Sequence, residues 1–319
     1  MDNLTHSLVG ALLGQAGLKR KTGLAMPALI IGANLPDIDA ACITYGIESL
    51  AMRRGITHGP AAWVLLPLML AGALWWFDLW QARRGKRPGG RLPVHFGWLY
   101  ALCFIACLTH PALDWLNVYG IRLLEPFSER WFYGDALFII DVWMWLGMGF
   151  AVWLSLRQEK NGKKWRWTGT AALVMIAAYI GGNSLTSFFA QAQVQVQAQA
   201  NSAQSYTQLV IVKPVPLYPW QREVLTLSHA GVWNAAQWSL FSGLDQRPVP
   251  MDYQPCRIPD ARRISIGSPA AAFLFWSRAP FAQRAHDGSI SLRDARYYDP
   301  LARDRFAVML PDLKCEPIG

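Results

Sequence analysis

The chain has 319 residues, of which 53% are hydrophobic and 16% are charged, and its formal net charge is +9. This charged fraction is low for a soluble protein, and the length is sufficient for two domains. The positive charge could by itself indicate nucleic-acid binding, but the basic residues of the first half form short clusters between apolar stretches. That pattern indicates membrane topology and excludes nucleic acid as an expected partner.

Two short apolar segments open the chain, at residues 8–18 and 24–35. A helix of about 11 or 12 residues is roughly 18 Å long, which is too short to cross a hydrocarbon core of about 30 Å. We therefore expect a short half-membrane helical hairpin. Pro36 is expected to end its second arm and to leave Asp37 and Asp39 on non-helical backbone.

Four longer apolar stretches follow, and each is long enough for a transmembrane helix. They lie at residues 60–80, 95–117, 136–156 and 168–189. If these spans alternate, the basic clusters at 19–21, 83–91 and 157–166 share one side, which the positive-inside rule assigns to the cytoplasm. The Asp37/Asp39 turn and the C-terminal segment then lie on the opposite side.

The last third of the chain is more polar. A glutamine- and alanine-rich segment at 191–205 is a polar linker or a helix extension, and its composition slightly favours helix. Short β-like runs separated by Pro and Gly turns then predict a small β-rich extracytoplasmic domain over 206–319, after a membrane domain over 1–190. The runs lie at 208–213, 222–227, 271–276, 289–292 and 306–310. In an oxidising compartment Cys256 and Cys315 would form a disulfide, which we state as a hypothesis.

Candidate metal ligands recur on the predicted extracytoplasmic side. His110 and Asp114 are four residues apart on a predicted helix, so both can reach one ion. A buried histidine that is merely paired with an acid is the more common arrangement, but further histidines and acids near the same face favour a metal. Asp37 and Asp39 suit either a two-metal site or one ligand with one acid that orients a histidine. Their alternative is an ordinary polar turn.

Two further segments carry histidines with polar neighbours. His6 follows Thr5 near the start of the chain, and His58 follows a stretch with two arginines. Arg53 and Arg54 lie on the side that the positive-inside rule disfavours, which makes them candidates for binding an anionic group such as phosphate. The alternative is interfacial charge with stems that snorkel along the membrane.

Four motifs together resemble the YdjM-like family of inner-membrane, metal-dependent hydrolases. They are Met1-Asp2-Asn3-Leu4-Thr5-His6, Leu35-Pro36-Asp37-Ile38-Asp39, Arg54-Gly55-Ile56-Thr57-His58 and Thr109-His110-Pro111-Ala112-Leu113-Asp114. The resemblance is strongest over residues 1–145. It implies a bacterial, multi-pass inner-membrane protein with a hydrolase activity. By position, it implies that the metal-site residues are His6, Asp37, Asp39, His58, His110 and Asp114.

These observations together predict a membrane-bound hydrolase in which one or two divalent ions activate water, with Asp37 and Asp39 as catalytic residues. Zinc is favoured and manganese is second, although mixed His/Asp ligation permits either. Arg53 or Arg54 would hold an anionic, lipid or lipid-linked substrate, and membrane lipids are expected partners. The alternative from another class is a non-catalytic, metal-stabilised scaffold or an ion transporter.

Overall fold

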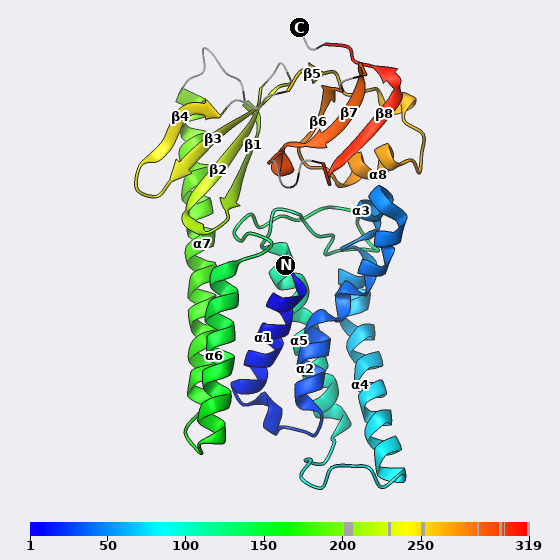
Figure 1. Cartoon of the computed structure of the whole chain (residues 1–319), viewed down its shortest axis with the longest axis vertical. Helices are drawn as coiled ribbons and strands as arrows, with labels where there is room; N and C mark the ends of the chain where they lie inside the picture. The colour runs from blue at the N-terminus through cyan, green and yellow to red at the C-terminus, as the bar shows by residue number, and fades with distance from the viewer. Residues whose placement is uncertain are drawn as a thin grey trace. The chain divides into compact units, whose positions relative to one another are not determined.

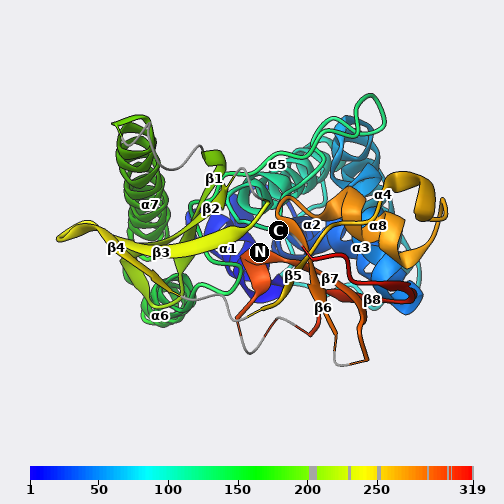
Figure 2. The same cartoon turned by 90° about the horizontal axis from the view of Figure 1, so that it is seen from above.

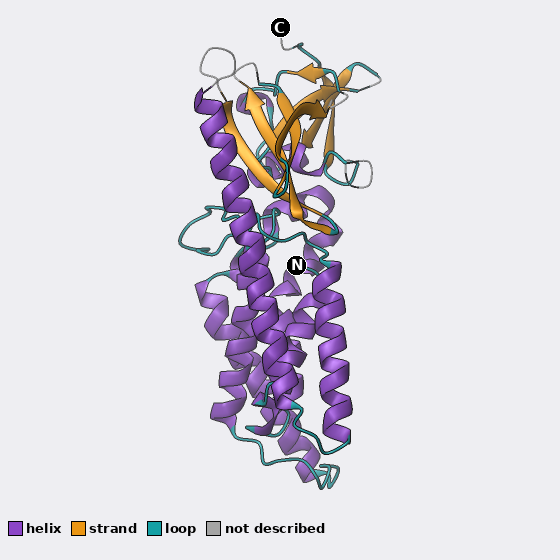
Figure 3. Ribbon diagram, turned by 90° about the vertical axis from the view of Figure 1, so that its left-hand side faces the viewer, coloured by secondary structure: helices purple, strands orange, loops and turns teal. Residues whose placement is uncertain are grey.

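The computed structural model describes residues 1–200, 207–228, 231–249, 253–285, 287–299, 302 and 304–317. The chain divides into two compact units. One contains Met1–Asp39 and Arg54–Ser184, and the other contains Ala40–Arg53 and Leu185–Gly319. The first is helical, and the second holds the β-sheets (Figures 1 and 3).

Helices account for all the long elements of the first 200 residues. The α-helices are α1 (Asn3–Gln15), α2 (Ala25–Asn34), α3 (Ser49–Met52), α4 (Pro60–Arg83), α5 (Phe96–Trp115), α6 (Val142–Lys160) and α7 (Arg166–Ala200). Three 3-10 helices, Leu18–Arg20, Leu35–Glu48 and Ile56–His58, connect them. The glutamine-rich segment continues α7 to Ala200, as its composition favoured, and the rest of the predicted linker, 201–205, lies outside the described residues.

Within the described residues, four segments are long and apolar enough to cross a membrane. They are Ala25–Met52, Pro60–Arg83, Phe96–Trp115 and Arg166–Gln197. The set differs from the four predicted spans, since it lacks the stretch at 136–156 and includes Ala25–Met52, which contains the second arm of the predicted half-membrane hairpin. Helix α6 begins only at Val142, because the Asp141 side chain caps it by accepting from the Met144 amide. Its last turn then carries Arg157 and Lys160, which shortens the apolar part.

Helices α1 and α2 form the predicted hairpin, with a close contact between them. A Cβ atom added at Gly10 would lie 2.5 Å from the Leu29 carbonyl oxygen, so glycine lets the two backbones approach. Leu29 is fully buried together with Leu99 and Leu102 of α5. The hairpin is therefore part of the core of the helical unit.

The backbone after α2 corrects one expectation. Pro36 does not leave Asp37 and Asp39 on non-helical backbone, because the 3-10 helix Leu35–Glu48 begins directly after α2 and contains both. Proline is tolerated in the first turn of a helix, where its missing N–H would have no intrahelical acceptor. Gly46 interrupts the helical geometry further along, with φ +65°.

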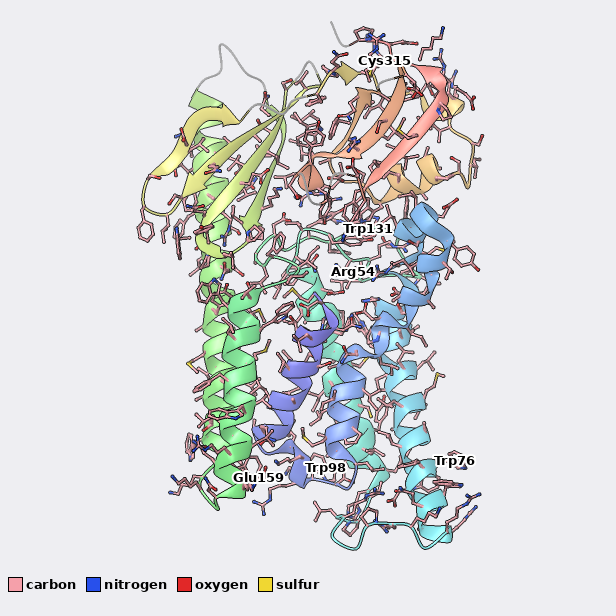
Figure 4. The ribbon with its side chains drawn as sticks, viewed as in Figure 1. Arg54, Trp76, Trp98, Trp131, Glu159 and Cys315 are labelled. Atoms are coloured by element: carbon pink, nitrogen blue, oxygen red, sulfur yellow. A yellow bond between two sulfur atoms is a disulfide. The ribbon has the colours of Figure 1, made fainter. Side chains whose placement is uncertain are left out.

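The two ends of the helical unit differ in character. The α1–α2, α4–α5 and α6–α7 connections, which carry the predicted basic clusters, lie at one end (Figure 1). Glu159, Trp98 and Trp76 mark this end in Figure 4, whereas Arg54 and Trp131 mark the other. The Arg54 end also receives the segment 116–141, which is held by isolated bridges between Asn117 and Leu137 and between Ile121 and Phe132.

The C-terminal part contains two four-stranded antiparallel sheets, in the orders β1-β2-β3-β4 and β5-β6-β7-β8 (Figure 2). The strands of the first are β1 (Thr207–Val215), β2 (Tyr218–Ser228), β3 (Trp233–Ser239) and β4 (Gly243–Val249). Those of the second are β5 (Pro255–Cys256), β6 (Pro280–Arg284), β7 (Ser289–Asp294) and β8 (Ala307–Lys314). Cys256 and Cys315 form the predicted disulfide, with 5.3 Å between their Cα atoms.

One predicted strand is a helix. Residues 271–276 lie in α8 (Pro269–Trp276), which Ser268 caps by accepting from the Ala271 amide. Pro269 occupies its first turn, where proline favours helix. The run has no alternation of apolar and polar residues, so the capping signal outweighs the β preference of its aromatic residues.

Candidate metal centre

The centre is built on the last turns of α5. His110 Nε2 lies 3.6 Å from Asp114 Oδ2, as expected for side chains four residues apart on one helix face. Both side chains are completely buried. The helix therefore presents an imidazole and a carboxylate together at the Arg54 end of the unit.

Asp37 and Asp39, both in the 3-10 helix after α2, contact different partners. Asp37 Oδ1 lies 3.6 Å from His110 Nε2. Asp39 Oδ2 instead accepts from the Arg54 amide at 2.7 Å and from Thr57 Oγ1 at 3.0 Å. With three residues per turn, positions two apart point in directions that differ by about 240°. Asp37 thus joins the α5 pair, and Asp39 faces the segment around His58.

His58 is oriented by a chain of hydrogen bonds. The Thr57 hydroxyl donates to Asp39 Oδ2, so its 2.9 Å contact with His58 Nδ1 requires the ring N–H to donate to Thr57 Oγ1. The proton on Nδ1 leaves the lone pair of Nε2 directed toward Asp114 Oδ2, 3.6 Å away. Burial, followed by electrostatic interactions with His110 and Arg54, lowers the pKa of His58 well below its ordinary value. A neutral imidazole is the form that binds metal.

His110, like His58, carries its proton on Nδ1. Its Nδ1 lies 2.7 Å from the Ala33 carbonyl oxygen, which can only accept, so this nitrogen carries the proton. Neither His110 Nε2 nor His58 Nε2 has a hydrogen-bond partner, although both are buried. Buried polar atoms are rarely left in this way unless a ligand or ion satisfies them.

Four side chains therefore converge as possible ligands. One donor atom each from Asp37, His58, His110 and Asp114 lies within 4.8 Å of the other three. Two imidazole nitrogens with carboxylate oxygens suit zinc or manganese, and this donor set does not choose between them. The hydrogen bonds from Ala33 and Thr57 are of the type that commonly fixes metal-bound histidines.

His6 lies beside these four residues. Its ring stacks on that of His110, with 3.8 Å between centroids and an interplanar angle of 17°. His6 Nε2 is 3.5 Å from Asp114 Oδ1, which also contacts the amino group of Met1. Neither ring nitrogen of His6 has a hydrogen-bond partner. His6 is thus close enough to Asp114 to take part in the centre, although it is outside the four-residue group.

The two arginines have different environments. Arg54 is buried, and its Nε lies 3.1 Å from Asp114 Oδ2 while Nη1 donates to Asn117 Oδ1 at 3.0 Å. Its guanidinium also lies over the Tyr119 ring, 4.5 Å from the centroid. Arg53 is half-buried and belongs to the other unit. Arg54 is thus placed at the centre.

Some residues of the centre carried no clear sequence signal. Asn117 lies three residues from Asp114, and this proximity in sequence is its only indication, whereas Thr57 belongs to the motif that ends at His58. The Ala33 carbonyl has none, because any residue supplies a backbone oxygen.

Asp141 caps α6 and accepts from the Tyr179 hydroxyl at 2.9 Å, which gives it a structural role.

Comparison with known proteins finds a family match over the part of the chain that holds this site. The family model described as YdjM inner membrane protein matches residues 1–187, which include every residue of the centre. The chain is also similar to "Uncharacterized protein YfhP" of Bacillus subtilis (strain 168), with 29% identity over 140 residues. That match covers 41% of this chain and 39% of the relative's length. No solved structure matches significantly.

Proposed function

The chain belongs to the YdjM inner membrane protein family, and we propose that it is a membrane-bound hydrolase that depends on a divalent metal ion. Asp37, His58, His110 and Asp114 would hold the ion, with His6 beside them. The observation that carries the proposal is the pair of buried, unpartnered Nε2 atoms of His58 and His110, directed at shared carboxylates. Zinc is our first choice and manganese the second.

The ion would supply Lewis acidity and a lowered pKa for water, which are the usual contributions of such a metal to hydrolysis. Asp37 is the ligand nearest the surface, since 9% of its side chain is exposed whereas the side chains of the other three are fully buried. It is therefore the side chain best placed to meet an incoming substrate and to take up a proton. Asp39 would act by holding His58 through Thr57, so it is a positioning residue rather than a ligand.

An anionic substrate suits the charge of the centre. The Arg54 guanidinium is a permanent cation at the site, and its positive charge would favour a phosphoester group near the ion. Because the site lies at one end of apolar helices, a lipid or lipid-linked substrate could reach it from the membrane. Arg53 stays a weaker candidate for the same role.

We propose an orientation from the basic residues in the loops between helices. The three loops at the end opposite the metal centre carry Lys19, Arg20 and Lys21 in one loop and further basic clusters in the other two. The positive-inside rule assigns that end to the cytoplasm. The metal centre and the β-rich domain over 206–319 would then face the extracytoplasmic side.

Hydrolase activity is tested with purified full-length protein in detergent. Phosphoesters, lipids and peptides are incubated with protein that has been stripped of metal and then reloaded with zinc or manganese. We expect metal-dependent product release that Asp37→Asn abolishes and His95→Ala preserves, because His95 is exposed and belongs to no part of the centre. Turnover that persists equally in stripped protein or in Asp37→Asn would contradict the proposal.

An ion transporter remains the second candidate. It would require polar residues along a path between both membrane faces. At the end opposite the metal centre, the buried acid Asp78 is already paired with Arg87 and Arg91, at 3.3 and 3.1 Å. This pairing favours a structural role for Asp78, and therefore a site over a pathway.

A further inference from the structure

An apolar patch lies at one end of the first β-sheet. Of nine exposed large hydrophobic residues in the described part of 207–317, five fall in or beside the β1–β2 and β3–β4 turns. These five, which we call the turn patch, are Leu217, Tyr218, Trp220, Leu240 and Phe241. Phe241 is 80% exposed, and a phenyl ring so placed in a polar domain indicates a binding surface.

The register of the sheet brings these residues together. Strand β2 begins at Tyr218 and β3 ends at Ser239, and Gln221 pairs with Ser239. The Leu240 amide donates to the Trp220 carbonyl oxygen at 2.9 Å, which joins the two turns. The Tyr218 and Trp220 rings meet edge to face, with 5.7 Å between centroids. The residues of the turn patch therefore lie at the same end of the sheet.

Contacts with α7 show which way this end of the sheet faces. The Arg222 guanidinium donates from Nε to Ser187 Oγ at 2.8 Å. Further along β2, Val224 packs in a cluster with Ala190 and Val194. Strand β2 and helix α7 thus advance in the same direction, and the start of β2 lies on the side from which α7 arrives (Figure 1).

Helix α7 also indicates where the bilayer ends. It has no charged residue from the exposed Trp167 to the exposed Phe188 and Phe189, and glutamines alternate with alanine or valine from Gln191 onward. The distance from Trp167 to Phe189 is roughly 33 Å at about 1.5 Å per residue, close to the thickness of a hydrocarbon core. We therefore expect Ser187, and with it Arg222, to lie near the bilayer boundary.

We propose that the turn patch inserts into the membrane interface and anchors the first β-sheet to the bilayer surface. The composition of the turn patch fits a lipid surface, because Trp and Tyr concentrate at the headgroup level while Leu and Phe enter the acyl region. Arg222, which is buried against Ser187, would fix the sheet to α7 at the depth where the patch meets lipid. This inference does not depend on the proposed hydrolase activity.

Site-directed spin labelling tests the proposal on the full-length protein in nanodiscs of phosphatidylethanolamine and phosphatidylglycerol. Cys42→Ser removes the partly exposed thiol, while Cys103 and Cys107 are fully buried and Cys256 and Cys315 are bonded to each other. Labels are placed by Phe241→Cys and Leu240→Cys in the patch. Asn234→Cys is the matched control, because Asn234 is exposed on the same strand pair but pairs with Thr226, away from the patch.

Collision of the label with oxygen, which partitions into lipid, is compared with collision with a nickel chelate, which stays in water. We expect the ratio of oxygen to nickel accessibility to be several-fold higher at both patch positions than at position 234. Equal ratios in proteins that retain the native disulfide would overturn the proposal and would leave the patch as a surface for a protein partner. If only one patch position enters lipid, the patch does not act as one surface, and the proposal also fails.

Discussion

The imidazole of His110 donates from Nδ1 to the carbonyl oxygen of Ala33, 2.7 Å away. This bond joins α5 to the end of α2 and decides which ring nitrogen faces Asp37 and Asp114. His58 reaches the same tautomer through Thr57 and Asp39. Two unrelated segments thus prepare two imidazoles in the same way, which is what a metal centre requires.

Thr57 should affect metal affinity without being a ligand. Thr57→Val removes the hydroxyl that accepts from His58 Nδ1 and donates to Asp39. We expect metal affinity to fall by about 10- to 100-fold, the usual effect of losing such a partner. Thr57→Ser, which keeps the hydroxyl, should stay close to wild type. Competition of metal-stripped protein with a chromogenic chelator measures both, and equal affinities for Val and Ser variants would contradict the role.

The disulfide should contribute measurably to the second unit. Cys256 and Cys315 are 59 residues apart, and cross-linking a loop of that length is worth about 4 kcal/mol on the chain-entropy scale. The double variant Cys256→Ser/Cys315→Ser should therefore become more sensitive to pulse proteolysis within the β-sheets. Reductant should sensitise wild type but not the variant. Equal proteolysis of wild type and variant without reductant would show that the bond adds nothing.

The buried pair Asp294–Arg296 should make that unit sensitive to acid. Burial by itself would raise the pKa of Asp294, but Arg296 at 2.7 Å and the hydroxyl of Ser277 at 2.5 Å hold it below the ordinary value of 3.8. A lowered pKa in the folded state contributes stability above pH 3.8 that is lost as the pH falls toward the folded value.

Asp294→Asn is expected to cost about 3–5 kcal/mol at pH 7, because it leaves a buried guanidinium without its charge partner. The difference between wild type and variant should stay constant from pH 7 to about 4 and shrink over the range below 3.8. Hydrogen exchange of the β6 and β7 amides across this range measures it. A difference that stays constant over the range would contradict the assigned pKa direction.

The sequence predicted the centre best where a regular helix controls the geometry. His110 and Asp114 share a face because α5 has the expected period, and the hairpin of α1 and α2 follows from the length of its apolar arms. The paths of Asp37 and Asp39 could not be predicted, because they depend on a 3-10 helix that continues past Pro36. The same is true of Arg54, whose partners Asn117 and Tyr119 come from a distant loop.

Errors in the predicted secondary structure also arose where two local sequence signals favour different elements. The run at 271–276 has β-favouring residues, yet Ser268 and Pro269 begin a helix there. At 136–156 hydropathy suggested one span, but the Asp141 cap moved the start of the helix to Val142. In both places a single capping residue outweighed the average preference of the residues that follow it.

Metal content tests the account most directly. Full-length wild type, His110→Ala and His95→Ala are purified in parallel without chelator, and bound zinc and manganese are measured by inductively coupled plasma mass spectrometry. We predict near-stoichiometric or higher metal in wild type and His95→Ala, and a large loss in His110→Ala with the fold retained by circular dichroism. Equal, sub-stoichiometric metal in wild type and His110→Ala would contradict the central claim that these side chains form a metal centre.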